Sequence, residues 1–186
     1  MKRPRVLIAC VGNIFFGDDA FGVEVARSLS RRDLPDGVRV VDFGIRGLDL
    51  TYALLEDDQA VILVDATPRG GPPGTLYLIE PDVSEAADAG GGGQIVETHG
   101  MDPVKVLRTV AAMGGRVDTL LLVGCEPATP PEGDEMRDGL SGPVRAAVGG
   151  AVLLIESLAA RLLRGEVIEA GGGNITHGQE AGTCRD

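Results

Sequence analysis

Side chains that can bind a cation or move a proton occur in three separate segments of this sequence. Asp18 and Asp19 follow the first apolar run of the chain, and Asp65 comes directly after the third. His99, one of only two histidines, precedes a predicted helix. Two carboxylates and an imidazole suit a borderline divalent ion such as nickel or zinc. Asp19, Asp65 and His99 therefore form the candidate metal site, provided that the fold brings them together.

Each of these side chains also has an ordinary structural explanation. Asp18 or Asp19 would stabilise the positive end of the helix that follows. Asp65, placed behind four apolar residues, would accept hydrogen bonds from the backbone amides of a turn. A single histidine in a loop is most often solvated or structural. From the residues alone, both interpretations stay open.

Other reactive sites find less support in the sequence. The Gly12–Gly22 segment matches neither Gly-x-Gly-x-x-Gly nor a P-loop, and its two acids would repel a phosphate at a helix N-terminus. The chain contains no Gly-x-Ser-x-Gly motif of serine hydrolases. Cys125 has no histidine near it in sequence, and we interpret it as a buried, inert thiol. A nucleotide cofactor and a serine nucleophile are therefore disfavoured.

The elements that must position the candidate residues alternate between strand and helix. Continuous apolar runs predict strands that are covered on both faces: Val6–Val11, Val38–Val41, Val61–Val64, Leu76–Ile79 and Leu120–Val123. Amphipathic patterns predict helices over about Phe21–Leu29, Asp102–Met113 and Val144–Leu162. This order favours an α/β three-layer sandwich with a mostly parallel five-stranded sheet. The short link at Pro72–Gly74 cannot hold a crossover helix and predicts one antiparallel edge strand.

In such a sheet, ligands bind beyond the carboxyl ends of the strands. The loops that carry Asp19, Asp65 and His99 are expected to meet at that edge. A length of 186 residues suits one α/β domain, 1–164. The segment 165–186 has little apolar surface and is predicted to be a flexible tail.

The charge and cysteine content limit the partners and the compartment. With 28 acidic and 17 basic residues the net charge is −11, which repels nucleic acid, and aromatic residues make up only 3%. The basic and apolar N-terminus imitates a signal peptide but lacks an Ala-x-Ala cleavage site, so we interpret it as the first buried strand. We expect no other run of membrane-spanning length. Three scattered cysteines without a Cys-x-x-Cys pair favour a cytoplasmic protein that contacts no membrane.

Several short motifs, taken in their order along the chain, resemble the hydrogenase maturation endopeptidases. They are Gly12-Asn13, Gly17-Asp18-Asp19 and Gly22, then Asp42 with Gly44 and Gly47, then Val64-Asp65-Ala66, and finally Thr98-His99-Gly100. The resemblance runs from about Val6 to Glu126, and the last long helix also fits it. The combination in this order is fairly specific, whereas any single motif would be a weak signal.

The resemblance implies a three-layer α/β fold and a specific peptidase activity. It implies removal of a short C-terminal extension from the large-subunit precursor of a nickel–iron hydrogenase, after nickel insertion. It also implies that Asp19, Asp65 and His99 bind metal, with Asp19 and Asp65 as the catalytic carboxylates of an aspartyl-type enzyme. The nickel would be carried by the precursor, and no other cofactor is implied. Because the first acid is glutamate in some relatives, Asp18 and Asp19 remain alternatives for the nearer ligand.

Two other functions fit parts of the sequence. A non-catalytic, nickel-binding docking module in hydrogenase assembly would use the same three residues without cleaving a peptide bond. A flavodoxin-like nucleotide binder would have a related fold, although the acidic first loop counts against it. The residues also leave open whether a carboxylate acts as the base or a metal-bound water attacks.

Overall fold

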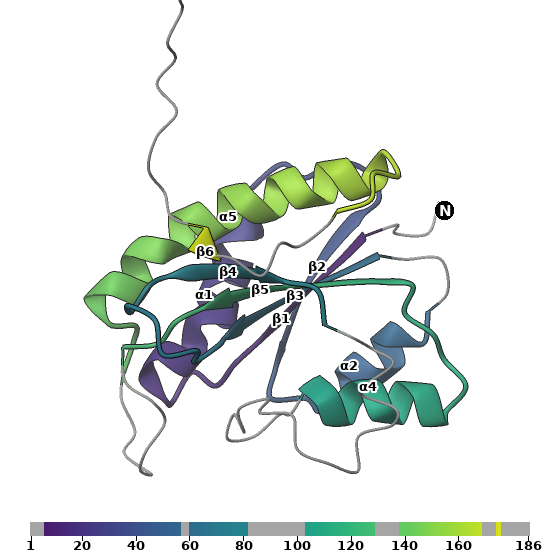
Figure 1. Ribbon diagram of the computed structural model, residues 1–186, viewed down its shortest axis with the longest axis horizontal. Coiled ribbons are helices and arrows are strands. Elements are labelled where there is room, and N and C mark those ends of the chain that lie inside the picture. The colour runs from purple at the N-terminus through teal and green to yellow at the C-terminus, as the bar shows by residue number, and fades with distance from the viewer. Residues whose placement is uncertain (1–5, 57–59, 82–102, 129–137, 169–173, 176–186) are drawn as a thin grey trace, which may run out of the picture.

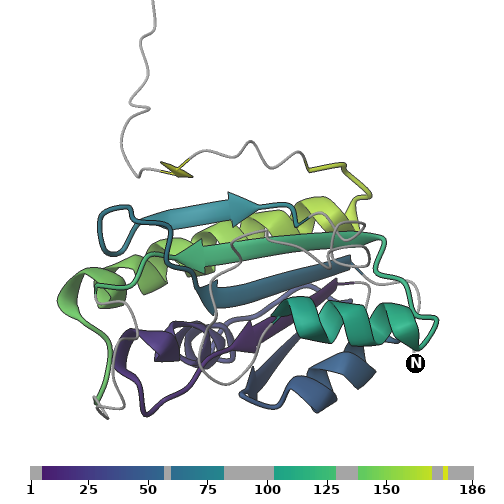
Figure 2. The ribbon, with the colours of Figure 1, turned by 60° about the horizontal axis from the view of Figure 1, so that its bottom comes forward.

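The computed structural model describes residues 6–56, 60–81, 103–128, 138–168 and 174–175. Its six strands are β1 (Val6–Val11), β2 (Val38–Gly44), β3 (Ala60–Ala66), β4 (Leu76–Ile79), β5 (Thr119–Cys125) and β6 (Asn174–Ile175). They form one sheet in the order β2-β1-β3-β5-β4-β6, which can be followed in Figure 2. β1, β2, β3 and β5 are parallel, and β4 runs antiparallel to both of its neighbours.

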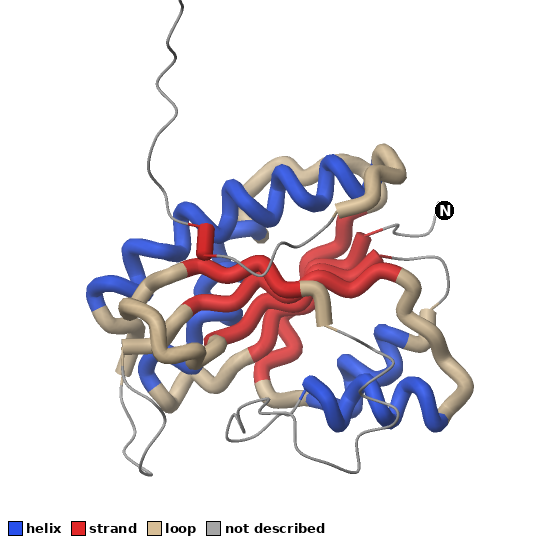
Figure 3. Tube along the Cα trace, in the orientation of Figure 1, coloured by secondary structure: helices blue, strands red, loops and turns tan. Residues whose placement is uncertain are grey.

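Helices cover both faces of the sheet, so that the molecule has three layers (Figures 1 and 3). One face carries α1 (Phe21–Leu29) and α5 (Gly142–Leu163), and the other carries α2 (Gly47–Leu54) and α4 (Pro103–Ala112). Successive strand residues point to opposite faces. Ile8 and Ile62 therefore pack in the core with α1 and α5, whereas Leu7 and Val61 pack with α2 and α4. The central strands β1, β3 and β5 are mostly apolar because both of their faces are buried.

The predicted α/β architecture is confirmed, with two differences in the sheet. The five predicted runs all lie within β1 to β5, and β4 is the antiparallel strand. However, β4 pairs with β5 rather than with β3, and the short β6 lies outside it. β5 takes the interior position because almost all of it is buried, whereas Leu78 and Ile79 of β4 are only partly covered.

Three elements in the described chain were not predicted. They are the 3-10 turn η1 (Gly17–Ala20), the helix α2 and the short strand β6. In α2, Leu50 and Leu54 are buried, but Leu48 and Tyr52 are exposed. Because apolar side chains lie on both sides of this helix, its sequence has no amphipathic pattern that would predict a helix.

The helix α5 is long and apolar enough, by length and composition, to cross a membrane. The expectation that no further segment has this property was therefore wrong, because small apolar residues in α5 extend its apolar character beyond the bulky ones. One side of α5 lies against the sheet, where Val144, Ala151, Ile155 and Leu158 are buried. The core helix of an α/β fold meets the same criteria, so this feature is weak evidence for membrane contact.

The structure describes only part of the predicted tail. Ile168 is buried in the core beneath α5, and Asn174–Ile175 forms β6 against β4. The rest of 165–186 lies outside the described residues, and its flexibility stays a prediction.

Candidate active site

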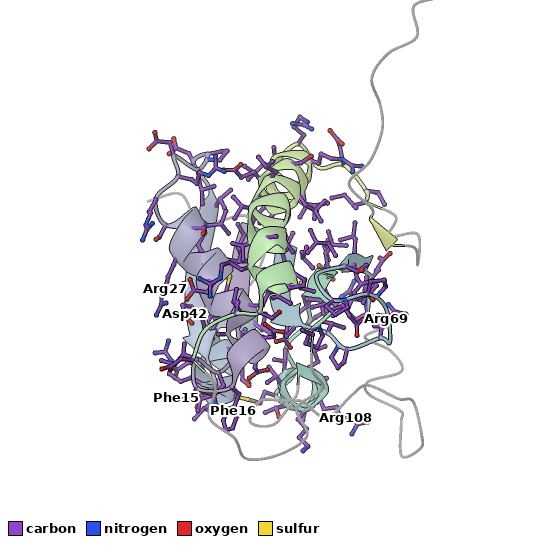
Figure 4. The ribbon with its side chains drawn as sticks, turned by 90° about the vertical axis from the view of Figure 1, so that its left-hand side faces the viewer. Phe15, Phe16, Arg27, Asp42, Arg69 and Arg108 are labelled. Atoms are coloured by element: carbon purple, nitrogen blue, oxygen red, sulfur yellow. The ribbon has the colours of Figure 1, made fainter. Side chains whose placement is uncertain are left out.

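The carboxyl ends of β1, β3 and β5 lie side by side, and Figure 4 views the molecule from this edge. Two glycines allow η1 to pack against these ends. A Cβ on Gly22, at the start of α1, would overlap the carbonyl oxygens of Val11 and Val64. Gly12 has a φ of +145°, and a Cβ there would overlap the carbonyl oxygen of Asp19. Glycine at both positions therefore brings the acids of η1 to the ends of β1 and β3.

Asp65 is a buried acid at the carboxyl end of β3. It is only 6% exposed, and its carboxylate accepts a hydrogen bond of 2.8 Å from the Ala66 N–H. By the alternation along the strand it shares the face of Val61 and Leu63, which is the face covered by α2 and α4. Burial raises the pKa of Asp65 well above its usual value, and the negative charge of Asp19 raises it further, against the lowering effect of the Ala66 bond.

Asp19 and Asp65 thus come together from separate elements. Asp19 belongs to η1, which packs against β3. Its Oδ2 accepts a hydrogen bond of 2.9 Å from the Asn13 N–H, which closes the turn between β1 and η1. The charge of Asp19 acts on Asp65, so the structure places two of the three candidate residues within electrostatic reach of each other.

Asp18 is buried and has a different set of partners. Its Oδ2 accepts hydrogen bonds from the Ala128 N–H (2.8 Å) and the Ser141 hydroxyl (2.9 Å), and its Oδ1 accepts one from the Ser141 N–H (2.6 Å). Asp18 therefore ties η1 to the loop after β5 and to the residue that precedes α5. These three donors favour Asp19, rather than Asp18, as the acid that faces Asp65.

His99, the third candidate ligand, lies outside the described residues. The helix that follows it, α4, begins at Pro103 on the face of the sheet that Asp65 shares. In Figure 1, α4 lies below the middle and right of the sheet and runs toward the beginning of β5. Among the residues that the structure describes, no three His, Cys, Asp or Glu side chains gather into a metal-binding group.

Glu126 is a further buried carboxylate at this edge, directly after β5. Its Oε2 accepts hydrogen bonds from the Tyr77 hydroxyl (2.6 Å) and the Arg69 N–H (2.8 Å), and its Oε1 accepts one from the Gly70 N–H (3.1 Å). Burial alone would raise the pKa of Glu126, but these bonds and one from the Gly71 N–H bring it below its usual value. The Arg69 guanidinium also lies over the Tyr77 ring, 5.5 Å from its centre. Glu126 therefore holds the loop that follows β3.

The two cysteines in the described part of the chain are buried free thiols. Burial raises the pKa of Cys125 to about 12, and the charges of Asp18 and Glu126 add to the effect. Burial likewise raises the pKa of Cys10. Both thiols therefore stay protonated at neutral pH, and the prediction that Cys125 is buried and inert is confirmed.

Glu126 and Ser141 organise this edge and were missed by the sequence reasoning. Glu126 follows the same pattern as Asp65, an acid directly behind a buried strand, and could have been found in that way. Ser141 gave no signal, because its partner Asp18 is 123 residues away in the chain.

The chain is similar to proteins of hydrogenase maturation in sequence and in fold. The model of the hydrogenase maturation protease family HycI matches residues 23–158. The hydrogenase expression/formation protein HupD of Rhodobacter capsulatus is 31% identical over 169 residues, covering 90% of this chain and 79% of that protein.

The chain is also similar to solved structures of hydrogenase maturation peptidases. The hydrogenase maturating endopeptidase HybD from E. coli superposes with a TM-score of 0.67 and 29% identity, covering 87% of this chain and 94% of that one. The hydrogenase 2 maturation peptidase from a Thaumarchaeota archaeon gives a TM-score of 0.61 and 31% identity, covering 84% and 98%. Since the family model spans most of the chain and HupD is matched over most of its length, the chain belongs to the hydrogenase maturation protease family and is a peptide-bond hydrolase.

Proposed function

We propose that this protease removes the C-terminal extension of the large-subunit precursor of a nickel–iron hydrogenase after nickel insertion. Asp19, Asp65 and His99 contact the nickel that the precursor carries. The proposal is supported above all by the pairing of Asp19 and Asp65, whose charges interact at the carboxyl edge of the sheet although they belong to η1 and β3.

The pair explains how a protease can recognise a metal-loaded substrate. A second negative charge beside the buried Asp65 is unfavourable, and burial adds to the cost. A nickel cation that the precursor brings to this edge offsets both effects, because a bound cation is the largest charge at such a site. An empty precursor provides no such offset and binds more weakly.

In the proposal, His99 is the third side chain that contacts the nickel. It stands four residues before Pro103, at which α4 begins. The four-residue link from His99 to Pro103 can span at most about 14 Å, even when it is fully extended. An imidazole beside two carboxylates is a ligand set that nickel accepts.

The same carboxyl groups serve the cleavage step. Hydrolysis of a peptide bond needs a group that takes a proton from water and returns one to the leaving amine. Asp19 and Asp65 are the acids of this edge whose charges act on each other, and two interacting carboxyl groups fit the task. Binding through the nickel would hold the scissile peptide near them, and such positioning lowers the barrier. The free thiols favour a reducing cytoplasm as the place of this reaction.

The test is cleavage of the nickel-loaded precursor, followed by the loss of mass of the large subunit. Asp19→Asn, Asp65→Asn and His99→Ala are each expected to slow cleavage about a hundredfold or more, because a small misplacement of the peptide has an effect of that order. Asp118→Asn is the matched control, since Asp118 is an exposed acid just before β5, at the opposite end of that strand. It should cleave like the wild type.

Metal-free precursor is the second substrate of the same assay. The wild type is expected to cleave it at least about tenfold more slowly. Equal cleavage of the two precursors would overturn recognition through nickel. Full activity of folded Asp65→Asn would overturn the assignment of the site.

A further inference from the structure

Five large apolar side chains in the loops that leave β1 and β2, and in the helix after β2, are exposed to solvent. We call them the apolar rim: Ile14 and Phe15 in the loop after β1, Ile45 after β2, and Leu48 and Tyr52 on α2. Elsewhere in the described chain, the large apolar side chains with similar exposure are scattered over separate elements: Met113, Leu153 and Val167. A cluster of exposed apolar residues on a folded protein marks an interaction surface more often than isolated ones do.

The two loops of the rim start side by side. They leave the neighbouring strands β1 and β2, and the Gly12 N–H donates a hydrogen bond of 3.1 Å to the Gly44 carbonyl. Leu48 and Tyr52 are four residues apart and lie on one side of α2. In Figure 4, Phe15 lies low in the view, on the side of the sheet that α2 and α4 cover in Figure 1. The rim residues therefore come from the adjoining carboxyl ends of β1 and β2 and from the helix that follows β2.

One short turn connects the rim to the candidate site. The Asn13 N–H donates to the Asp19 carboxylate, while the Asn13 side-chain oxygen accepts a hydrogen bond of 3.1 Å from the Phe15 N–H. The same turn thus holds Asp19 toward the strand ends and leaves the Phe15 side chain 53% exposed. Phe15 therefore lies only four residues from Asp19 and is joined to it through one turn.

The charged side chain of Arg46, which lies within the rim, interacts with groups close to it in the chain. Arg46 stands between Ile45 and Leu48, and its guanidinium donates to the carbonyl oxygens of Asp42 and Phe43. It also pairs with the Asp49 carboxylate at 3.5 Å. These contacts balance the charge of Arg46, although both Arg46 and Asp49 stay exposed beside the apolar side chains. A partner that fits this surface is apolar and uncharged at the point of contact.

We infer that the apolar rim docks an uncharged, apolar segment of the hydrogenase large-subunit precursor, beside the part that presents its nickel. This inference rests on the proposed function, because it takes the precursor as the partner. The rim is continuous with the site that the precursor has to reach. Docking there orients the precursor before the nickel and the scissile peptide meet Asp19 and Asp65.

The test compares steady-state cleavage of the nickel-loaded precursor by Phe15→Ser, Leu48→Ser and the double variant. Phe15 is 53% and Leu48 64% exposed, so only that part of each side chain can become buried on docking. Each single change is expected to raise KM about three- to tenfold, and the double change about ten- to a hundredfold. kcat should stay within about twofold, because the rim touches no reacting atom. Leu153→Ser is the matched control, an equally exposed leucine on α5, and it should leave both constants unchanged.

The outcomes separate the docking surface from the proposed function. An unchanged KM in the folded double variant overturns the docking surface while the function stands. If the wild type does not cleave at all, the proposed function fails, and the affinity for the precursor measured by surface immobilisation still decides docking. A weaker affinity of the double variant then supports the rim, and an equal affinity overturns it. Sedimentation that shows a wild-type dimer dissociated by Leu48→Ser, with KM unchanged, assigns the surface to self-association instead.

Discussion

At the scale of single residues, Asp65 and Glu126 occupy similar places and have opposite properties. Each carboxyl group lies at the end of a buried strand, and each is less than a tenth exposed. Asp65 has the charge of Asp19 beside it, which adds to the effect of burial and raises its pKa. Glu126 accepts hydrogen bonds from a tyrosine and from successive backbone amides, which outweigh burial and lower its pKa. Burial raises the pKa of both groups, and the hydrogen-bond donors around Glu126 are what reverse its effect there.

The two acids are expected to change stability with pH in opposite directions. The folded pKa of Glu126 lies below the unfolded value of about 4.3, so its stabilisation is present above that pH and is lost as the pH falls through the folded pKa. Glu126→Gln should lower the free energy of unfolding by about 1–3 kcal/mol at pH 7, and the difference should shrink below about pH 4.

Asp65→Asn should do the reverse when urea titrations at several pH values measure the free energy of unfolding of both variants. Its folded pKa lies above the unfolded value of about 3.9, so wild-type stability is complete below that pH and falls as the pH rises through the folded pKa. The asparagine keeps the acceptor for Ala66 and removes the charge, so the variant should be more stable than the wild type at pH 7 and equal to it at pH 3. A variant that is less stable at pH 7 would contradict the assigned repulsion.

The sequence identified Asp65 as a buried acid because four apolar residues precede it, but it could not distinguish Asp18 from Asp19. That choice depends on Ala128 and Ser141, which are more than a hundred residues away in the chain. A linear pattern carries no information on which of two adjacent side chains turns toward such distant donors.

At the scale of elements, the close contact of α1 with the sheet sets the position of η1. The start of this helix lies so near β1 and β3 that Gly22 has no room for a methyl group. Gly149 in α5 has open space around its missing Cβ. The two glycines both lie in helices, where alanine would otherwise be preferred by about 0.5–1 kcal/mol.

Replacing each glycine by alanine is therefore expected to have opposite effects on thermal unfolding. Gly149→Ala should raise Tm by roughly 1–4 °C, from its higher helix propensity. Gly22→Ala should lower Tm by roughly 3–10 °C, because overpacking costs about 1–3 kcal/mol and a kcal/mol moves Tm by about 2–4 °C in a chain of this size. Equal stabilisation by both changes would show that α1 can move away from the sheet freely.

The strands were predictable and α2 was not, for a physical reason. A strand that is covered on both faces needs an uninterrupted apolar run, and β1, β3 and β5 have one. The helix α2 exposes Leu48 and Tyr52 while it buries Leu50 and Leu54, so its pattern resembles neither a buried nor an amphipathic helix. If the apolar rim docks the precursor, the residues that obscured this helix are the ones that serve recognition.

At the scale of the whole molecule, the charge of −11 opposes the compact state. The described ion pairs are largely exposed, as in Arg116–Asp118 and Arg164–Glu166, and such pairs contribute little. Salt screens both the repulsion between like charges and the attraction within the ion pairs. Because the repulsion is the larger effect here, salt should stabilise the folded state.

Tm is accordingly expected to rise by a few degrees when sodium chloride is raised from about 0.01 M to about 0.15 M, which shortens the Debye length from about 30 Å to about 8 Å. Calorimetry at pH 7 measures this directly, and potassium chloride at the same ionic strength should give the same shift. A fall in Tm with salt would mean that the ion pairs dominate.

Asp18 has one more consequence for the molecule. Its carboxylate fixes Ala128 and Ser141 relative to η1, so the two ends of the intervening stretch are held by the same buried group. The position of η1 therefore depends on these hydrogen bonds rather than on the chain between those ends. This stretch is therefore a suitable place to graft a fluorescent reporter that follows the arrival of the precursor without disturbing its cleavage.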